Sequence, residues 1–475
     1  MEFFRERRQQ RVEPEFQQRE SEQQQQEQHE LRASSAGFLM RAHDLTVGLD
    51  ELELVYPTPG VTLAELLEAY YGCRRNKRNT MNALAFEVDY ESELLALRDE
   101  INSGSYVPGR SMAFIVDKPV KREIFAADFR DRVVHHLIIN KLNPLFEHEF
   151  IYDSYACRVG KGTLFGINRL DTFIRRCSQN YSRDCYVLKL DIRGFFMHIN
   201  ARKLLLRLSD FIDAEYVGAD SAMLKNLCEI VLMNKPSENC VIRGKPSDWD
   251  GLPKDKSLFY SPADCGLPIG NLSSQVFANF YLDIFDHFVK HDLGMKYYGR
   301  YVDDFVLVHE SREHLTSLIP VIRNFLANDL ALELHPKKIY LQHYSHGVRY
   351  LGAVVKPNRM YVGKRTKGNF YDSIMRHNAV VAGHVPSIAE CEAFRASANS
   401  YLGVMGHFDT RRLRRSMVGK HVRGWWKYAH TNSDVSKIVL RPNTGVSSVQ
   451  YRYVDTASPQ WSDGVGGEPS QLARR

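Results

Sequence analysis

Two short apolar runs in the middle of the chain enclose a pair of adjacent carboxylates. The first run spans residues 295–302, the second spans 305–308, and Asp303 and Asp304 lie between them. Runs of this length with a short polar break predict a β-hairpin with the acids at its tip. Adjacent strand residues point to opposite faces, so a turn is needed to bring both acids to one side. A solvated acidic turn is the alternative for this motif alone.

A buried strand that ends in a carboxylate is predicted earlier in the chain. Residues 186–191 read Tyr-Val-Leu-Lys-Leu-Asp, which is typical of a strand inside a sheet with Asp191 at its C-terminal edge. A strand-end acid and a hairpin-tip acid pair can hold two cations about 3.5–4 Å apart, as in two-metal phosphoryl-transfer sites. A simple strand-end cap is the alternative for Asp191 alone.

A Gly/Pro turn and one long amphipathic helix are predicted between these acids. Residues 266–275 read Gly-Leu-Pro-Ile-Gly-Asn-Leu-Ser-Ser-Gln, and Asn271 or Ser273 is placed to cap the helix. One apolar face recurs every four residues, at Leu272, Val276, Phe280, Ile284 and Phe288. A Gly-rich turn before a helix lets the backbone approach a nucleotide closely.

Composition and charge narrow the class of protein. The 475 residues are 44% hydrophobic and 11% aromatic, which is enough for several domains with a large core. The net charge is only +6, so nucleic-acid binding would use local basic stripes. No run approaches the roughly 20 apolar residues of a membrane span. The eight cysteines form no CxxC pair, so we expect reduced thiols in a cytoplasmic protein.

The order of strand acid, Gly turn with helix, and Tyr-x-Asp-Asp hairpin resembles the reverse transcriptases. The similarity is to the bacterial enzymes related to group II introns, retrons, diversity-generating elements and antiviral defence, over about residues 65–430. Further motifs that agree in order are Pro119-Val-Lys-Arg122, Asp128-Phe-Arg-Asp-Arg132, residues 154–163, residues 189–196, Leu334-His-Pro-Lys-Lys338 and Val348-Arg-Tyr-Leu-Gly352. The resemblance implies a right-hand polymerase with fingers, an α+β palm and a helical thumb, plus N- and C-terminal extensions.

The expected domains follow the chain in order. They are a disordered or helical Gln/Glu-rich extension (1–36), an N-terminal lead-in with fingers (37–180), a palm (181–355) with a Pro-rich insertion (234–265), a thumb (356–437) and a flexible tail (438–475). Within the fingers, the apolar pattern predicts helices at 91–102 and 129–146.

The resemblance implies a metal site made of three carboxylates. Asp191, Asp303 and Asp304 would bind two Mg²⁺ ions, with Mn²⁺ as the alternative ion, and the carbonyl of Ile192 would be a further ligand. The same three acids are the implied catalytic residues, together with a lysine that protonates the leaving pyrophosphate.

Basic residues receive phosphate-binding roles from the resemblance. The pyrophosphate-protonating lysine would be Lys338, or its neighbour Lys337. Arg122 would grip the incoming triphosphate, because a guanidinium matches phosphate oxygens. Arg158 and Lys161 would assist it or contact the template. Solvated surface positions are the alternative for each of these side chains.

The nucleotide pocket would be completed by an aromatic gate and by the palm helix motif. Phe196, five residues after Asp191, stands where the family keeps a ring that excludes a ribose 2′-hydroxyl; Phe195 is the alternative gate. Most reverse transcriptases carry Gln-Gly and Ser-Pro in the helix motif, whereas this chain has Ile269-Gly270 and Ser274-Gln275. An aliphatic side chain in place of an amide removes a hydrogen bond that could report correct pairing, so we expect reduced fidelity.

Nucleic-acid contacts are expected from two further segments. Tyr350, Leu351 and Gly352 resemble the primer grip. A predicted thumb helix that Asp409 could cap carries basic residues interleaved with Trp425, Trp426 and Tyr428. Its predicted contacts with the nucleic-acid backbone are Arg411, Arg412, Arg414 and Arg415.

The implied function is an RNA-directed DNA polymerase that makes cDNA in a bacterial cytoplasm. Its partners would be dNTPs, a DNA primer or product and an RNA template, by resemblance a cognate noncoding RNA, while an oligomer or accessory protein is left open and no membrane is expected. The Ile-Gly-Asn-Leu-Ser-Ser-Gln motif favours a diversity-generating element, whereas the extensions and the palm insertion favour antiviral defence. A catalytically silent RNA-binding scaffold on a polymerase fold is the alternative.

Overall fold

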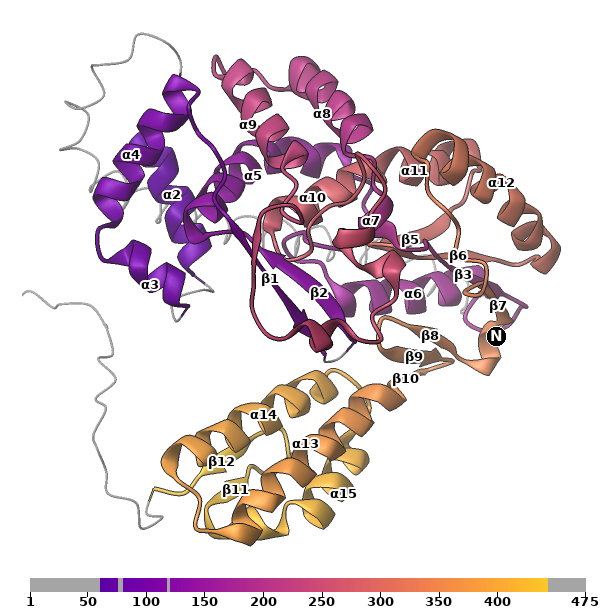
Figure 1. The fold of residues 1–475 in the computed structure, drawn as a ribbon. Helices are drawn as coiled ribbons and strands as arrows, with labels where there is room; N and C mark the ends of the chain where they lie inside the picture. Colours follow the sequence, from indigo (N-terminus) through magenta and orange to yellow (C-terminus); the bar gives the residue numbers. More distant parts are fainter. Residues whose placement is uncertain (1–59, 76–79, 118–119, 443–475) are drawn as a thin grey trace, which may run out of the picture. The chain divides into compact units, whose positions relative to one another are not determined.

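The structure, a computed structural model, describes residues 60–75, 80–117 and 120–442. It divides into two compact units, residues 1–363 and 364–475 (Figure 1). The Gln/Glu-rich extension, most of the lead-in, Pro119 and most of the tail lie outside the described residues. Within the described ranges, no helix combines the length and the apolar character needed to cross a membrane.

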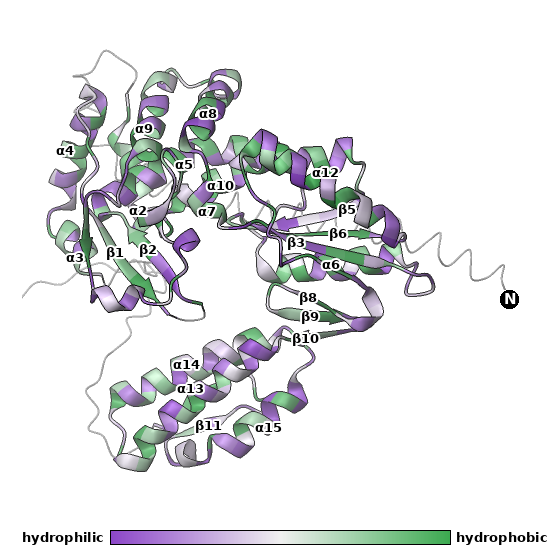
Figure 2. Ribbon diagram, turned by 45° about the vertical axis from the view of Figure 1, so that its right-hand side comes forward, coloured by the Kyte–Doolittle hydropathy of each residue, from purple (hydrophilic) through white to green (hydrophobic). Residues whose placement is uncertain are grey.

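The first unit is built around a four-stranded antiparallel sheet in the order β5-β6-β3-β7. Its strands are β3 (Tyr186–Asp191), β5 (Tyr297–Tyr301), β6 (Asp304–His309) and β7 (Tyr340–His343). Helices α6 (Thr163–Cys177) and α12 (Arg312–Leu330) pack against it. In Figure 2, β6 is coloured mostly as hydrophobic, whereas β5 is pale to purple although its middle residues are buried. The buried polar residues of β5, Tyr298 and Arg300, are hydrogen-bonded to Asp286 of α11 (Asp283–His287).

A second, smaller sheet belongs to the fingers region. Strands β1 (Ser111–Val116) and β2 (Arg122–Ala126) form a hairpin, and β4 (Cys240–Ile242) adds to β1 in parallel. Beside it, α2 (Leu63–Arg74), α3 (Met81–Glu87) and α9 (Ser221–Met233) pack on α5 (Phe129–Glu149), while α4 (Tyr90–Ser103) packs on α2 and α8 (Ala201–Glu215) packs on α9. Helices α4 and α5 confirm the two helices predicted for this region. Strand β4 and the short turns η2 (Pro246–Trp249), η3 (Lys254–Lys256) and η4 (Leu258–Tyr260) lie in the predicted palm insertion, which joins the fingers sheet.

The single long helix predicted from residue 272 onward is interrupted. It consists of α10 (Leu272–Tyr281), α11 (Asp283–His287) and a π-helical turn, η5 (Phe288–Asp292). The N-cap is Asn271, as one of the two predictions had it, but its side chain makes no cap hydrogen bond. Instead, Asn271 Oδ1 accepts from the Ala127 amide at 3.1 Å, which ties the helix start to the fingers.

A third sheet, β8 (Val348–Tyr350), β9 (Ala353–Lys356) and β10 (Arg359–Val362), completes the first unit after the turn η6 (Tyr344–His346). The second unit contains α13 (Lys364–Gly383), α14 (Ile388–Gly406), α15 (Arg411–His421), η7 (Arg423–Lys427), β11 (Ala429–Thr431) and β12 (Ile438–Leu440). Strand β12 pairs with β11, so the predicted flexible tail begins with ordered structure. Trp425 is fully buried and stacks on Phe394 with ring centroids 4.2 Å apart, which makes it the core of this unit.

Candidate active site

Strand β3 places Asp191 beside the hairpin acids. Its residues Val187, Leu188 and Leu190 are buried and fix the strand in the middle of the sheet, between β6 and β7. In the β3–β6 ladder Asp191 lies directly opposite Asp304. The predicted strand-end acid and hairpin-tip acid are therefore neighbours across one antiparallel pair.

The hairpin turn consists of Val302 and Asp303, between β5 and β6. Val302 has a φ of +55°, in the left-handed region that a β-branched residue rarely adopts. Two-residue hairpins normally place Gly at such a position. The amide of Ile192 donates to the Asp303 carbonyl at 3.2 Å, so the turn is bonded to the end of β3. Backbone strain of this kind persists only where the surroundings hold it, and such positions cluster at functional sites.

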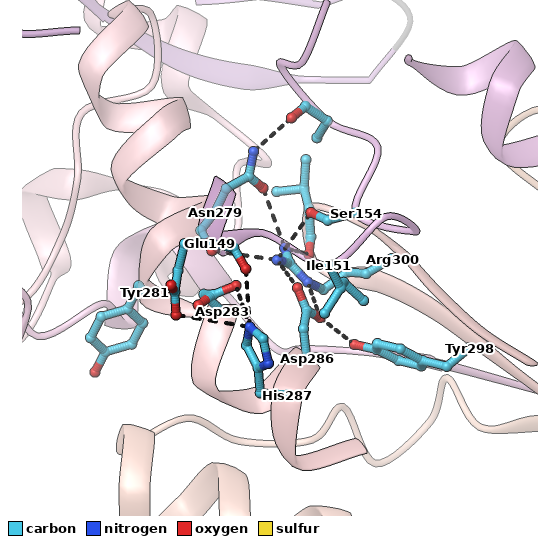
Figure 3. A network of polar contacts seen from close by, with 12 residues as sticks. Glu149, Ile151, Ser154, Asn279, Tyr281, Asp283, Asp286, His287, Tyr298 and Arg300 are labelled. Carbon is cyan, nitrogen blue, oxygen red and sulfur yellow. Dashed lines mark hydrogen bonds and ion pairs between the residues drawn. The ribbon is translucent and has the colours of Figure 1, made fainter. Parts of the chain in front are cut away.

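A buried arginine on β5 supports the strained turn from inside the protein (Figure 3). Arg300 is fully buried and forms a bidentate ion pair with Asp286 of α11, with Nε–Oδ1 and Nη2–Oδ2 distances of 2.7 and 2.5 Å. Its Nη1 donates to the Val302 carbonyl at 3.0 Å and to Asn279 Oδ1 at 3.3 Å. Tyr298 donates to the same Asp286 carboxylate at 2.6 Å. The guanidinium thus joins the hairpin turn to helices α10 and α11.

This network also reaches the segment 154–163, one of the motifs that resemble the reverse transcriptases. Arg300 exchanges backbone hydrogen bonds with Asp153 and Tyr155, at 2.9 and 3.0 Å, and Asn279 donates to the Ala156 carbonyl at 2.7 Å. The sequence analysis missed Arg300, Asp286 and Asn279. The only sequence signal was Arg300 itself, an arginine inside an otherwise strand-like run. A buried charge requires a partner, so its position implied polar partners elsewhere in the chain.

Two lysines neutralise the acid cluster. The Lys338 ammonium lies 2.8 and 2.9 Å from the two oxygens of Asp191, and Lys189 lies 3.1 Å from Asp304. Lys337 is exposed and does not take this place, so the geometry favours Lys338 of the two predicted alternatives. Burial, together with the charges of Asp191 and Asp304, raises the pKa of Asp303 to about 6. Three crowded carboxylates that attract two ammonium groups fit a site for divalent cations, which prefer such oxygen ligands.

The residues predicted at the nucleotide gather around the fingers hairpin. Phe196 and Ile269 are partly buried against the same small cluster, which contains Phe125. The Phe125 amide donates to the Ile269 carbonyl at 2.8 Å. Gly270 has a φ of +134°, and a Cβ there would meet the Phe125 carbonyl oxygen at 3.0 Å. The Gly turn therefore lies directly against strand β2, and the absence of a Cβ at Gly270 permits this close approach.

The predicted basic ligands differ in how free they are. Arg122 is exposed, and its charge acts against the burial that raises the pKa of Tyr301 in the hairpin. Arg158 is not free: its guanidinium pairs with Glu147 and donates to two backbone carbonyls, at 2.7 and 3.1 Å. Every nitrogen of its head group is engaged within the protein, so the predicted role of Arg158 at the triphosphate or the template would require it to leave these partners.

Two other predicted nucleotide contacts are partly engaged. Lys161 donates to the Tyr152 carbonyl at 2.7 Å, and burial with the nearby Arg158 lowers its pKa to about 8. Gln275 is exposed, and its Oε1 lies 2.9 Å from Cys157 Sγ. Both residues keep solvent access, so their predicted roles remain predictions.

The insertion is fastened to the fingers by a glutamate that sequence reasoning missed. Glu123 is 1% exposed and accepts from Trp249 Nε1, Ser257 Oγ and the Leu258 amide, at 2.7, 2.8 and 2.6 Å. It follows Arg122 directly in β2. The insertion therefore packs behind the strand that carries the predicted triphosphate ligand.

The predicted primer grip is a tight hairpin between β8 and β9. Leu351 and Gly352 form its turn with φ values of +46° and +88°, and the Gly352 carbonyl accepts from Gly363 at 2.7 Å. Tyr350 is buried, and its hydroxyl accepts or donates no hydrogen bond within the described ranges. The segment is therefore a hairpin with a left-handed turn, and its contact with a primer stays a prediction.

The predicted basic thumb helix is α15, which begins after Thr410 and not after Asp409. Arg411, Arg412 and Arg415 are exposed. Arg414 is buried and donates to the Val435 carbonyl at 2.8 Å, so it is a structural residue of the second unit. This corrects the predicted phosphate contact of Arg414 because its side chain points into the unit.

Comparisons with known proteins bear on the same region. The sequence profile of the family described as reverse transcriptase (RNA-dependent DNA polymerase) matches residues 118–355. Protein YkfC of Escherichia coli (strain K12) is 22% identical over 294 residues, covering 55% of this chain and 70% of YkfC.

Solved telomerase structures are similar to this chain at lower sequence identity. Apo telomerase from Candida tropicalis is 11% identical with a TM-score of 0.41, covering 66% of this chain and 58% of that chain. Telomerase from Candida albicans, in complex with the TWJ fragment of telomeric RNA, is 10% identical with a TM-score of 0.39, covering 67% and 57%. The chain thus spans less than two thirds of these telomerase chains.

The family match contains all three candidate carboxylates and Lys338. It spans half of the chain, from before β2 to the end of β9. The chain belongs to the reverse transcriptase family of RNA-directed DNA polymerases, with the right-hand polymerase fold.

Proposed function

We propose that this protein makes cDNA on an RNA template by nucleotidyl transfer at Asp191, Asp303 and Asp304. The observation that carries the proposal is the pairing of Asp191 opposite Asp304 at the tip of a hairpin whose strained turn contains Asp303. A structural protein has no need to crowd three carboxylates at the ends of two neighbouring strands, since like charges raise one another's pKa and cost stability.

The three carboxylates, with the Ile192 carbonyl, would hold two Mg²⁺ or Mn²⁺ ions. When bound, such ions activate an attacking hydroxyl and neutralise charge on the leaving group. The lysines would then exchange partners. Lys338, on a flexible stem and 43% exposed, would release Asp191 and become available to protonate the pyrophosphate.

Other side chains would select and orient the nucleotide. Arg122, exposed on β2 near the hairpin, would bind the triphosphate. Phe196 would exclude the ribose 2′-hydroxyl. Ile269 would pack beneath the base pair without the hydrogen bond of an amide, which lowers fidelity.

For the biological role we propose a bacterial retroelement or an antiviral defence system, with a cognate noncoding RNA as template. The helix motif with Ile269 and Gln275 supports mutagenic copying, whereas the insertion fastened by Glu123 and the terminal extensions support defence. Sequencing cDNA made from one RNA template by the parent and by Ile269→Gln separates them. A lower error frequency in the variant supports mutagenic copying, and identical error spectra support defence.

Primer extension on an RNA template tests the polymerase activity. Asp303→Asn should lower incorporation about a thousandfold or more, equal to about 4 kcal/mol of transition-state stabilisation, because one ligand charge is lost. Asp292→Asn, at an exposed site, is the matched control and should keep full activity. Equal rates for the parent and Asp303→Asn would reject the assignment. RNA binding without extension by the parent itself would favour the scaffold alternative.

Sugar selection tests the predicted gate separately. Phe196→Ala should raise the ratio of ribonucleotide to deoxynucleotide incorporation about tenfold or more, because a ring that blocks the 2′-hydroxyl is worth at least about 1.4 kcal/mol of discrimination. Tyr260→Ala, at an exposed aromatic on the insertion, is the control. An unchanged ratio in competition assays would move the gate to Phe195.

A further inference from the structure

A second group of metal-ligating side chains contains none of the catalytic carboxylates. Glu149 is the last residue of α5, and Asp283 and His287 are four residues apart on α11. Figure 3 shows the three side chains pointing toward one another. One ligand atom from each lies within 4.8 Å of the other two.

The distances within this group match the coordination shell of one ion. His287 Nε2 lies 3.6 Å from Asp283 Oδ1, 3.9 Å from Glu149 Oε1 and 3.1 Å from the Glu149 carbonyl oxygen. A tetrahedron with metal–ligand bonds of about 2.1 Å has edges of about 3.4 Å. A single imidazole N–H can donate to only one of the three oxygens, whereas a cation between them contacts all three.

The buried carboxylate of Asp283 is an independent indication of a ligand. Its side chain is 3% exposed, and among the residues that the structure describes its Oδ1 has no hydrogen-bond donor. That oxygen faces His287. A buried carboxylate oxygen is costly unless it is paired or coordinates a metal. Arg207, a nearby cation, donates to the Tyr281 carbonyl at 3.0 Å.

We propose that Glu149, Asp283 and His287 bind one divalent transition-metal ion, with the Glu149 carbonyl as the fourth ligand. The imidazole nitrogen favours Zn²⁺ and similar ions over Mg²⁺, which prefers oxygen ligands only. Two carboxylates and a neutral imidazole balance the charge of such an ion. The site is therefore chemically different from the three-carboxylate catalytic site.

The ion has a structural role that follows from its position. It fastens the C-terminal end of α5 to α11. One turn along, Asp286 of α11 holds Arg300, and Arg300 holds the Val302 carbonyl of the catalytic turn. The site thus stiffens the support of the hairpin without contacting nucleotide.

Zinc binding to the full-length chain tests the proposal. Asp303→Asn protein serves as the parent, so that catalytic carboxylates compete less, and it is stripped with EDTA before Zn²⁺ alone is added. We expect one equivalent of zinc to remain after desalting, measured by elemental analysis. His287→Ala and Glu149→Gln should each weaken zinc affinity at least tenfold in calorimetric titrations. His148→Ala, which removes the exposed imidazole next to Glu149, should leave the affinity unchanged.

Folding of the variants is checked without metal. His287 and Glu149 are 38% and 46% exposed, so the metal-free variants should melt at the parent temperature, and zinc should raise the melting temperature of the parent but not of His287→Ala. Equal zinc affinity in parent and both variants would overturn the proposal. Failure of the parent to retain stoichiometric zinc, or stabilisation by Mg²⁺ but not Zn²⁺, would overturn it as well.

Discussion

The carboxylate of Asp286 on α11 and the carboxylates of Asp191 and Asp304, at the end of β3 and the start of β6, are neutralised in different ways. Asp286 is fully buried and is held by Arg300, which is also fully buried. Asp191 and Asp304, in contrast, are paired with lysines whose side chains are 43% and 21% exposed. The Asp286–Arg300 pair is buried inside the protein, whereas the pairs of Asp191 and Asp304 with lysines are partly exposed to solvent.

The difference separates a permanent counter-ion from a replaceable one. The planar guanidinium binds Asp286 through two bonds and also donates to the Val302 carbonyl of the turn and to Asn279, so its geometry is fixed. A lysine on a flexible stem can leave its carboxylate when a cation or phosphate competes for the site. The inner pair, Asp286 with Arg300, therefore supports the position of the turn, while the outer pairs, Asp191 with Lys338 and Asp304 with Lys189, neutralise acids that are partly open to solvent.

The largest effect is expected from removing Arg300, the cation of the inner pair. Arg300→Met should lower the free energy of unfolding by about 3–5 kcal/mol, because Asp286 is left as an uncompensated buried charge. Thermal melting measures this, and Arg312→Met at an exposed site is the control.

A double variant separates stability from positioning. Arg300→Met with Asp286→Leu should regain much of the stability, since an apolar pair can replace a buried ion pair. Primer extension should stay impaired, because the Val302 carbonyl still lacks its donor. Full activity in the double variant would show that Arg300 does not position the turn.

Removing an outer cation should affect chemistry more than stability. Lys338→Met should slow single-nucleotide incorporation about a hundredfold, the usual contribution of a general acid, while changing stability by less than about 1 kcal/mol. Lys337→Met is the matched control. If both variants slow the reaction equally, the experiment does not single out Lys338 as the proton donor, and its assigned role is wrong.

The smallest expected effect concerns pH and the metal-free protein. The pKa of Asp303 is raised to about 6 in the folded protein, whereas the pKa of an aspartate in the unfolded chain is near 4. The contribution of Asp303 to folding stability is therefore complete below about pH 4 and is lost as the pH rises through about 6. At pH 7.5 in EDTA, Asp303→Asn should therefore be more stable than the parent by about 1–2 kcal/mol.

Melting curves across pH test this sign. The advantage of Asp303→Asn should shrink toward pH 4 and should also shrink when Mg²⁺ is added to the parent. Asp292→Asn should show no such trend. A stabilisation that is the same at every pH would mean that crowding of the carboxylates is not its cause.

The sequence by itself determined the parts of this protein that depend on local pattern. Strand β3 ends at Asp191 as predicted, and the hairpin has Asp303 in its turn and Asp304 at the start of β6. Alternation and apolar runs report burial along a short segment, so they locate such elements and the acids attached to them. The order of motifs then led to the family that the profile match identifies.

Only the tertiary structure decided which polar residues are bound inside and which are free. It buried Arg300 and Arg414, it bound the head group of Arg158 to Glu147, and it left Arg122 exposed. It also broke the predicted long helix at Leu282 and fastened the insertion to Glu123. The partners that make these differences are remote in sequence, as with Ser154 and Arg300, which are 146 residues apart. Periodicity describes one segment at a time, whereas a buried charge is satisfied by whichever distant segment the fold brings to it.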